Sequence, residues 1–202
     1  MNRLGMVVDI AHCSDDTVRD CLELSKAPIV STHSCCKALR DHRRNLPDDL
    51  LKAIAEKGGV VQINFCPSFL SAEYDARMAS TGIGDKADAV EAAFIADPGN
   101  PGKVAEWVEM QRELEVMPRP SYKDVVDHID HAVQVMGIDH VGVGSDYDGI
   151  LVAPEGLENV SRMPVLWEEM RCRGYSETDI EKVAGKNFLR VLEAVEKVAS
   201  GL

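Results

Sequence analysis

Three residues able to bind a metal ion or move a proton each follow a short apolar run in this sequence. They are His12, His33 and Asp146. A neutral imidazole is a good ligand for zinc, and a carboxylate can either bind the metal or carry a proton during catalysis. This combination favours metal-assisted hydrolysis as the chemistry of the chain.

The apolar runs that precede these residues are predicted to be strands of a parallel sheet. They cover residues 6–10, 28–32 and 141–145, and a further run of the same type covers 60–65. The run at 6–10 is expected to be buried, as parallel strands are. In a βα-barrel the carboxyl ends of the strands face one mouth, where the chemistry occurs. Residues far apart in the sequence can therefore meet there.

Helical patterns separate and follow these runs. Amphipathic spacing and capping residues predict helices near 14–24, 48–58, 122–136, 160–173 and 176–198. Strand and helix thus alternate four times, which predicts an α/β fold with a parallel sheet and right-handed crossovers. A complete (β/α)₈ TIM-type barrel needs about 250 residues and eight such units. Only four are present, so we predict half of a barrel, followed by C-terminal helices.

The segment 67–120 is longer than a compact βα connection requires. It contains alanine-rich helical stretches and a loop at 97–102. We interpret it as a helical insertion on the side of the chemistry, serving either as a lid or as an oligomer contact, within a single partial domain spanning 1–202.

Composition narrows the class of protein. The 202 residues carry a formal net charge of −12 and are 45% hydrophobic. The acidity excludes a basic nucleic-acid footprint, and no apolar run approaches the ~20 residues needed to span a bilayer. The first residues have no signal-peptide pattern. The six cysteines form no CxxC pair or regular framework, so we expect reduced and mostly buried thiols.

Several blocks of the sequence resemble the renal (membrane) dipeptidase family, zinc dipeptidases of the amidohydrolase superfamily. The blocks are residues 1–12, 27–34, 43–49, 144–149 and 185–191. Together they are spread over nearly the whole chain apart from the 67–120 segment.

The resemblance implies a role for each matching residue. His12 and His33 match the two histidines that bind the second, more exposed zinc. Arg44 matches the arginine that pairs with the free carboxylate of the dipeptide, and a guanidinium suits this task because it meets a carboxylate with two parallel hydrogen bonds. Asp146 matches the carboxylate that moves the proton. The nucleophile in the family is a hydroxide held between two zinc ions.

The resemblance also implies what these residues do not supply. In the family, a His-x-Asp pair on the first strand holds the other zinc, and a glutamate on the third strand bridges the metals. A further histidine before the fifth strand contacts the substrate. Residues 1–11 already match the fifth strand, so the resemblance implies the C-terminal half of a (β/α)₈ TIM-type barrel, about strands five to eight. We therefore expect one zinc site to be only partly supplied. Either pairing with a missing N-terminal half or a homodimer is expected.

The remaining histidines and nearby carboxylates are interpreted as structural. His128 and His131 lie three residues apart on one predicted helix, away from the strand ends. His42 is expected to be exposed and His140 to open a strand at the opposite face. We expect Asp9 and Asp148 to organise the strand-end loops, and the cysteines beside His12 and His33 to bind no metal.

Two alternatives stay open at the level of the sequence. The first alternative is that the chain acts as a truncated, inactive fragment or as an assembly module, because two protein ligands alone hold zinc weakly. A weaker alternative is another amidohydrolase reaction, such as cyclic-amide hydrolysis, although the Arg44 block argues against it. The sequence leaves open the cellular compartment, because relatives include exported and internal enzymes.

Overall fold

The computed structural model describes residues 1–201, and its centre is one sheet of four parallel strands. The strands lie in the order in which they occur in the chain. They are β1 (Val8–Asp9), β2 (Ile29–Ser31), β3 (Val60–Asn64) and β4 (Val141–Gly144). Each strand pairs with the next in parallel. The predicted α/β fold with a parallel sheet is therefore confirmed.

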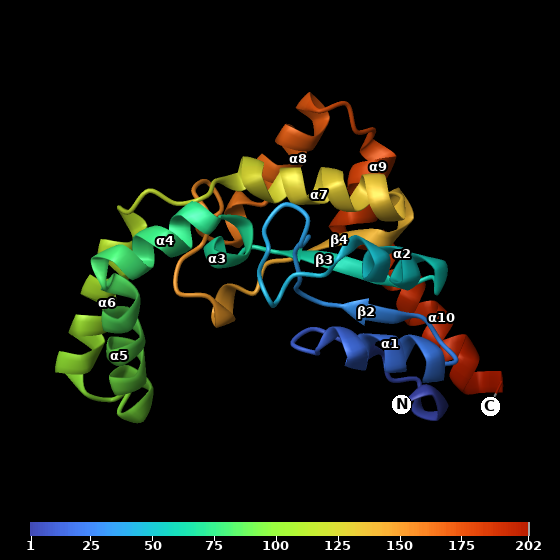
Figure 1. Ribbon diagram of the computed structural model, residues 1–202, viewed down its shortest axis with the longest axis horizontal. Coiled ribbons are helices and arrows are strands. Elements are labelled where there is room, and N and C mark those ends of the chain that lie inside the picture. The colour runs from blue at the N-terminus through green and yellow to red at the C-terminus, as the bar shows by residue number, and fades with distance from the viewer. Residues whose placement is uncertain (202) are drawn as a thin grey trace.

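Helices connect and cover the strands (Figure 1). They are α1 (Asp15–Leu24), α2 (Asp48–Glu56), α3 (Pro67–Leu70), α4 (Ala72–Thr81), α5 (Ile83–Ala96), α6 (Pro101–Glu115), α7 (Tyr122–Met136), α8 (Pro164–Cys172), α9 (Glu177–Glu181) and α10 (Asn187–Gly201). Side chains set several of the helix starts. Ser14 accepts a hydrogen bond from the Thr17 amide, and Ser121 forms a capping box with Asp124. Within residues 1–201, none of the helices combines the length and apolarity that a bilayer crossing needs.

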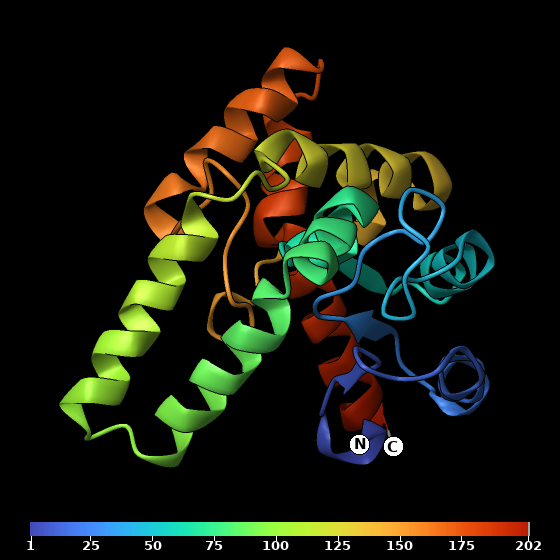
Figure 2. The ribbon, with the colours of Figure 1, turned by 60° about the vertical axis from the view of Figure 1, so that its left-hand side comes forward.

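The two faces of the sheet are covered by different helices. Ile29 and Val61 join the large core that contains residues of α1, α2 and α7, whereas their neighbours Val30 and Val60 pack with Val191 and Val195 of α10. Successive side chains of a strand point to opposite faces, so this alternation follows from the pleat. Figures 1 and 2 show that the N-terminus lies beside the end of α10.

Strand β1 is an open edge, which corrects the expectation of a buried strand at 6–10. Only Val8 and Asp9 pair with β2, and Met6 is 51% exposed. Ile10 alone among the five residues is buried. An edge strand and a central strand have similar apolar sequences, so the pattern did not distinguish them.

The C-terminal helices are more interrupted than the sequence indicates. A 3₁₀ turn at Val160–Arg162 precedes α8, so 160–173 is not one helix. The expected helix at 176–198 divides into α9, a π-helical turn at Lys182–Lys186 and α10, with non-helical backbone at Gly185. A capping sequence upstream does not reveal such an interruption further along the helix.

Residues 67–115 fold as four helices, and α5 and α6 form an antiparallel hairpin that extends away from the sheet (Figures 1 and 2). We call α4, α5 and α6 the helical arm. It has a small core of its own, in which Tyr74, Ala87, Met110 and Leu114 pack with Val152. A salt bridge of 2.6 Å between Lys86 and Glu113 joins its two long helices.

Candidate active site

His12 and His33 lie side by side at the carboxyl ends of β1 and β2. The centroids of their rings are 4.9 Å apart, with an angle of 64° between the ring planes. The two residues are far apart in sequence, and the parallel pairing of β1 with β2 brings them together. We call the carboxyl end of the sheet, with the loops that follow the strands, the mouth.

The backbone at the mouth is unusual at two of the three predicted positions. His12 has φ 68° and Asp146 has φ 59°, and these are the non-glycine residues with positive φ in residues 1–201. A residue with a Cβ pays on the order of 1–3 kcal/mol to hold such a conformation, and such residues cluster at functional sites. The two residues with positive φ are thus two of the candidate site residues predicted from the sequence.

Hydrogen bonds fix His33 and leave one of its nitrogens free. Thr32 Oγ1 lies 2.8 Å from His33 Nδ1 and donates to Asp9 Oδ2 at 2.6 Å. His33 Nε2 is buried and has no hydrogen-bond partner among the described residues. A buried polar atom without a partner is costly, so this nitrogen is suited to a ligand.

The surroundings of His12 lower its pKa and so favour the neutral imidazole. Burial lowers the pKa of His12, and the positive charge of Arg44 and the proximity of His33 add to the effect. The carboxylates of Asp146 and Asp9 act in the opposite direction on the same pKa but do not outweigh it. The neutral imidazole is the form that binds a metal ion.

Asp146 is held by a neighbour that the sequence analysis did not select. Asn64, fully buried at the end of β3, donates from Nδ2 to Asp146 Oδ2 at 3.1 Å. Its Oδ1 accepts a hydrogen bond from the Cys66 amide. Asn64 is the last residue of β3, so its strand-end position was the available signal.

Two glycines of the 142–149 run allow close packing around Asp146. A Cβ on Gly144 would lie 1.8 Å from the carbonyl oxygen of Thr32, so β4 approaches the end of β2 more closely than a side chain permits. A Cβ on Gly149 would lie 2.3 Å from Asp146 Oδ1. The glycines thus bring Asp146 to the mouth and leave space for its carboxylate.

Arg44 lies in the loop after β2, and its guanidinium is partly withdrawn from water. Its Cζ is 5.3 Å from the centroid of the Phe69 ring, and its Nη2 is buried without a partner among the described residues. Burial lowers the pKa of Arg44, while the charge of Asp146 opposes that shift. Phe69 is a second residue that the sequence analysis missed, because nothing in the sequence indicates that α3 returns to this loop.

The donor set fits part of a zinc site. His12 and His33 are appropriate zinc ligands, and His33 Nε2 is an unpartnered buried atom next to the second imidazole. Residues 1–201 contain no group of three His, Cys, Asp or Glu side chains arranged to hold a metal ion. Catalytic zinc commonly has three protein ligands, of which His12 and His33 would supply two.

Three of the other histidines, His128, His131 and His140, lie outside the mouth, whereas His42 lies in the loop after β2. His128 is 2% exposed, and its Nδ1 accepts a hydrogen bond from the Cys36 amide at 3.0 Å. His131 Nε2 lies 2.8 Å from Asp48 Oδ1, and His140 Nδ1 lies 2.8 Å from the Gly59 carbonyl oxygen. The expectation of an exposed His42 is wrong, because its half-buried ring packs on Phe69 with centroids 4.8 Å apart.

All six cysteines are free, but only Cys35 and Cys36 are buried, so the expectation of mostly buried thiols holds for these two alone. Burial raises the pKa of Cys35 well above its usual range and that of Cys36 to about 12. A thiol binds metal as the thiolate. Neither thiol therefore competes with His33 as a ligand.

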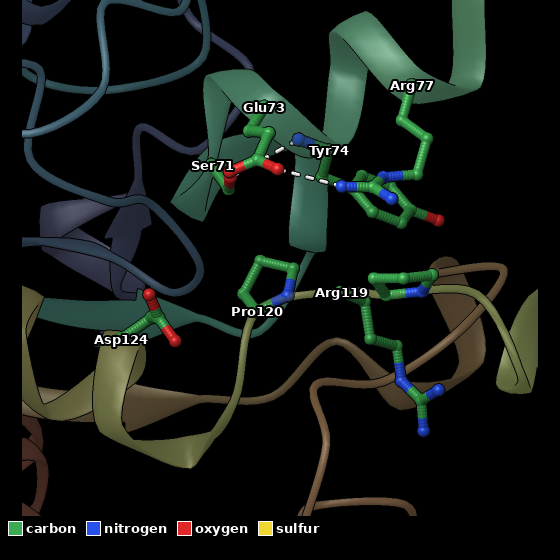
Figure 3. A pocket seen from close by; sticks show the side chains of 8 residues that line it. Ser71, Glu73, Tyr74, Arg77, Arg119, Pro120 and Asp124 are labelled. Carbon is green, nitrogen blue, oxygen red and sulfur yellow. Dashed lines mark hydrogen bonds and ion pairs between the residues drawn. The ribbon is translucent and has the colours of Figure 1, made fainter.

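A separate cavity of about 180 Å³ lies where the helical arm joins the rest of the protein (Figure 3). Glu73 and Arg77 on one side form a salt bridge of 2.7 Å. Arg119 on the other side points its guanidinium away from these two residues, and its Nε donates to the Ala153 carbonyl oxygen at 2.9 Å. The cavity contains none of the predicted site residues.

The fold and the mouth together define an α/β protein whose polar residues gather at the carboxyl ends of parallel strands, where α/β folds bind their ligands. A family model described as membrane dipeptidase (peptidase family M19) matches residues 1–202. The chain belongs to this family of metallopeptidases.

Curated relatives carry the name dipeptidase. The chain is 37% identical over 202 residues to dipeptidase aclJ of Aspergillus oryzae, covering 100% of this chain and 38% of the relative. It is 33% identical over 199 residues to dipeptidase verJ of Clonostachys rogersoniana, covering 98% and 40%. The chain thus spans about two fifths of the length of these relatives.

Solved structures of similar proteins share the fold. The probable dipeptidase PvdM of Pseudomonas aeruginosa superposes with a TM-score of 0.75 at 34% identity, over 98% of this chain and 52% of that chain. A metallopeptidase of Rhodobacter sphaeroides, liganded with a phosphinate mimic of the dipeptide L-Ala-D-Ala, superposes with a TM-score of 0.69 at 31% identity. That match covers 96% of this chain and 44% of the other.

Proposed function

We propose that these 202 residues form the C-terminal half of a (β/α)₈ barrel, with β1 to β4 as its strands five to eight and 67–120 as a helical insertion. The protein that contains them hydrolyses dipeptides with the help of zinc. The observation that carries the proposal is the pair of strand-end imidazoles, 4.9 Å apart, one with a buried and unpartnered Nε2.

Each residue of the mouth has a distinct task in this proposal. His12 and His33 hold one zinc ion, which when bound polarises the peptide carbonyl and lowers the pKa of water. Arg44 directs its unpartnered Nη2 to the C-terminal carboxylate of the dipeptide. Asp146, held by Asn64, accepts a proton from water and delivers it to the departing amine.

The substrate class follows from Arg44 and from the relatives. A guanidinium in the mouth favours peptides with a free C-terminal carboxylate. The Rhodobacter sphaeroides metallopeptidase, liganded with a mimic of L-Ala-D-Ala, supports tolerance of a D-residue at that end. Residues beyond these 202 complete the first zinc site and the bridge between the two metal ions.

A second candidate function is a non-catalytic metal-binding or assembly module. It is favoured by the two-ligand donor set, because the described residues contain no third ligand beside His12 and His33. In that case the open edge at β1 would serve to pair with another chain.

A hydrolysis assay on zinc-loaded protein separates the candidates. The intact protein should cleave L-Ala-D-Ala and fail with its C-terminal amide, which offers no carboxylate to Arg44. Asp146→Asn should reduce turnover by roughly 10²–10⁴-fold, since general acid–base catalysis contributes that much, with zinc content unchanged. Zinc-loaded wild-type protein without turnover would support the module. Cleavage of cyclic amides but not dipeptides would support the weaker alternative reaction.

A further inference from the structure

A carboxylate and a hydroxyl lie behind the histidine pair in a continuous chain of hydrogen bonds. Asp9 Oδ1 accepts from the backbone amides of Thr32 and Ala11, each at 3.0 Å. Asp9 Oδ2 accepts from Thr32 Oγ1 at 2.6 Å, and Thr32 Oγ1 lies 2.8 Å from His33 Nδ1. One side chain on β1 thus contacts the backbone just before both His12 and His33.

The directions of these hydrogen bonds follow from the number of protons. A carboxylate can only accept, and a threonine hydroxyl has a single proton to donate. Since Thr32 gives that proton to Asp9, its oxygen must accept from His33 Nδ1–H. A neutral imidazole carries one ring proton, so the lone pair is then on Nε2, the buried atom without a partner.

We propose that Asp9 and Thr32 are positioning residues, which hold His33 in the Nδ1–H tautomer and so direct its Nε2 lone pair to a cation shared with His12. The proposal rests on the proposed function for the identity of that cation as zinc. A metal-binding histidine commonly donates its other N–H to a second group, and the loss of that group costs about 10–100-fold in metal affinity.

The two histidines are positioned by different means. Within residues 1–201, the ring of His12 makes no hydrogen bond. Its place is set by its backbone at φ 68° and by the hydrogen bond from the Ala11 amide to Asp9. Loss of the Thr32 hydroxyl therefore affects His33 alone. Loss of the Asp9 charge affects the tautomer of His33 and the turn that carries His12.

Asp9→Asn makes a sharp test because it reverses the proton arrangement. If the amide oxygen keeps the two backbone bonds, the amide nitrogen takes the place of Oδ2 and donates to Thr32 Oγ1. Thr32 no longer donates to residue 9 and is free to give its own proton to His33 Nδ1, which favours the ring proton on Nε2. An imidazole with a proton on Nε2 cannot bind metal through that atom.

The ring nitrogens of His33 report the tautomer directly by ¹⁵N NMR on the metal-free intact protein, at a pH where the imidazole is neutral. We expect Nδ1–H in wild type and in Thr32→Ser, Nε2–H in Asp9→Asn, and no fixed preference in Thr32→Val. Far-ultraviolet circular dichroism identifies any variant that fails to fold, and the Thr32 pair then carries the test.

Zinc affinity, measured by competition with a chromophoric chelator, gives the second readout. Thr32→Val should bind zinc about 10–100-fold more weakly than wild type, and Thr32→Ser within about threefold. Thr81→Val, which removes an exposed hydroxyl in the helical arm, is the matched control and should bind as wild type.

Two results would overturn the proposal: Nε2–H on His33 of wild-type protein, or equal zinc affinity in the valine and serine variants of Thr32. The proposed function fails by a different result, namely correct tautomers and zinc affinities in a protein that hydrolyses no dipeptide. The two failures are therefore distinguishable.

Discussion

Two pairs of histidines in this protein lie in opposite surroundings. His12 and His33 lie at the strand ends with a buried, unpartnered Nε2. His128 and His131 lie three residues apart on α7, where the first accepts a hydrogen bond from Cys36 and the second contacts Asp48. His128 and His131 have the close spacing of a metal site, but their ring nitrogens are occupied by contacts within the protein. Open hydrogen-bonding capacity, and not spacing alone, distinguishes a site from a scaffold.

The largest expected effect comes from exchanging the same residue type in each pair. His33→Gln should abolish tight zinc binding and lower turnover by at least about 1,000-fold, since it removes one of two ligands in the described residues. His128→Gln should retain zinc and turnover but lose about 1–3 kcal/mol of unfolding free energy, because its buried hydrogen bond is disturbed. Zinc content, turnover and urea unfolding measure the three quantities. If His128→Gln lost zinc while His33→Gln kept it, the roles expected for the two pairs would be exchanged.

A glycine tests how closely the mouth depends on the position of Asp146. Gly149→Ala places a methyl group where Asp146 Oδ1 now lies, and the carboxylate must turn away. A displacement of about 1 Å can cost about 100-fold in rate, so we expect that loss in turnover with little change in melting temperature.

Gly99→Ala, in a loop where an added Cβ meets nothing within 4 Å, is the control for Gly149→Ala and should behave as wild type. If both alanine variants keep full turnover, the space left by Gly149 has no role in placing the carboxylate.

Buried His128 should make the protein sensitive to acid. Burial lowers the pKa of His128 from its ordinary 6.5 to about 4, so between these values the unfolded chain binds the proton and the folded protein does not. The neutral state of His128 thus stabilises the folded protein above pH 6.5, and this stabilisation is lost as the pH falls towards 4. The loss amounts to about 2 kcal/mol at pH 5. Urea unfolding at pH 7 and pH 5 should show that loss in wild type and lack it in His128→Gln. Equal losses in both proteins would remove His128 as the cause.

The smallest expected effect concerns substrate binding. Arg44→Lys keeps the charge but loses the planar guanidinium above Phe69 and its two parallel donors. We expect the KM for L-Ala-D-Ala to rise about tenfold with a small change in kcat. The exposed neighbour Arg43, changed to Lys, should leave KM unaltered. A response of KM to Arg43→Lys but not to Arg44→Lys would move the clamp to the other arginine.

The order of elements could be predicted from the sequence because local patterns determine it. Apolar runs alternating with amphipathic stretches were sufficient for the four strands and for α1, α2 and α7. The strand-end positions of His12 and His33 then followed from the parallel sheet. Their proximity needed only the pairing of β1 with β2.

The hydrogen bonds and ring contacts that individual side chains make with distant segments could not be predicted. The link from Asp9 through Thr32 to His33, the donation from Asn64 to Asp146 and the stacking of Phe69 under Arg44 all depend on side-chain direction. The exposure of β1 depends on what packs beside this strand. Periodicity reports which face of an element is apolar, but it does not identify the atom that a polar group meets.

The position of the helical arm between β3 and β4 has a consequence for how the chain folds. β2 pairs with β3 through Val30 and Val60, and β3 pairs with β4 through Val61 and Val141. The chain segment that must close to form the second pair is much longer than the segment that closes to form the first. Closing a longer loop costs more chain entropy and slows the step. The hairpin of α5 and α6 forms from local contacts and shortens that loop. His12 and His33 should therefore come together early in folding, and Asp146 should join them last.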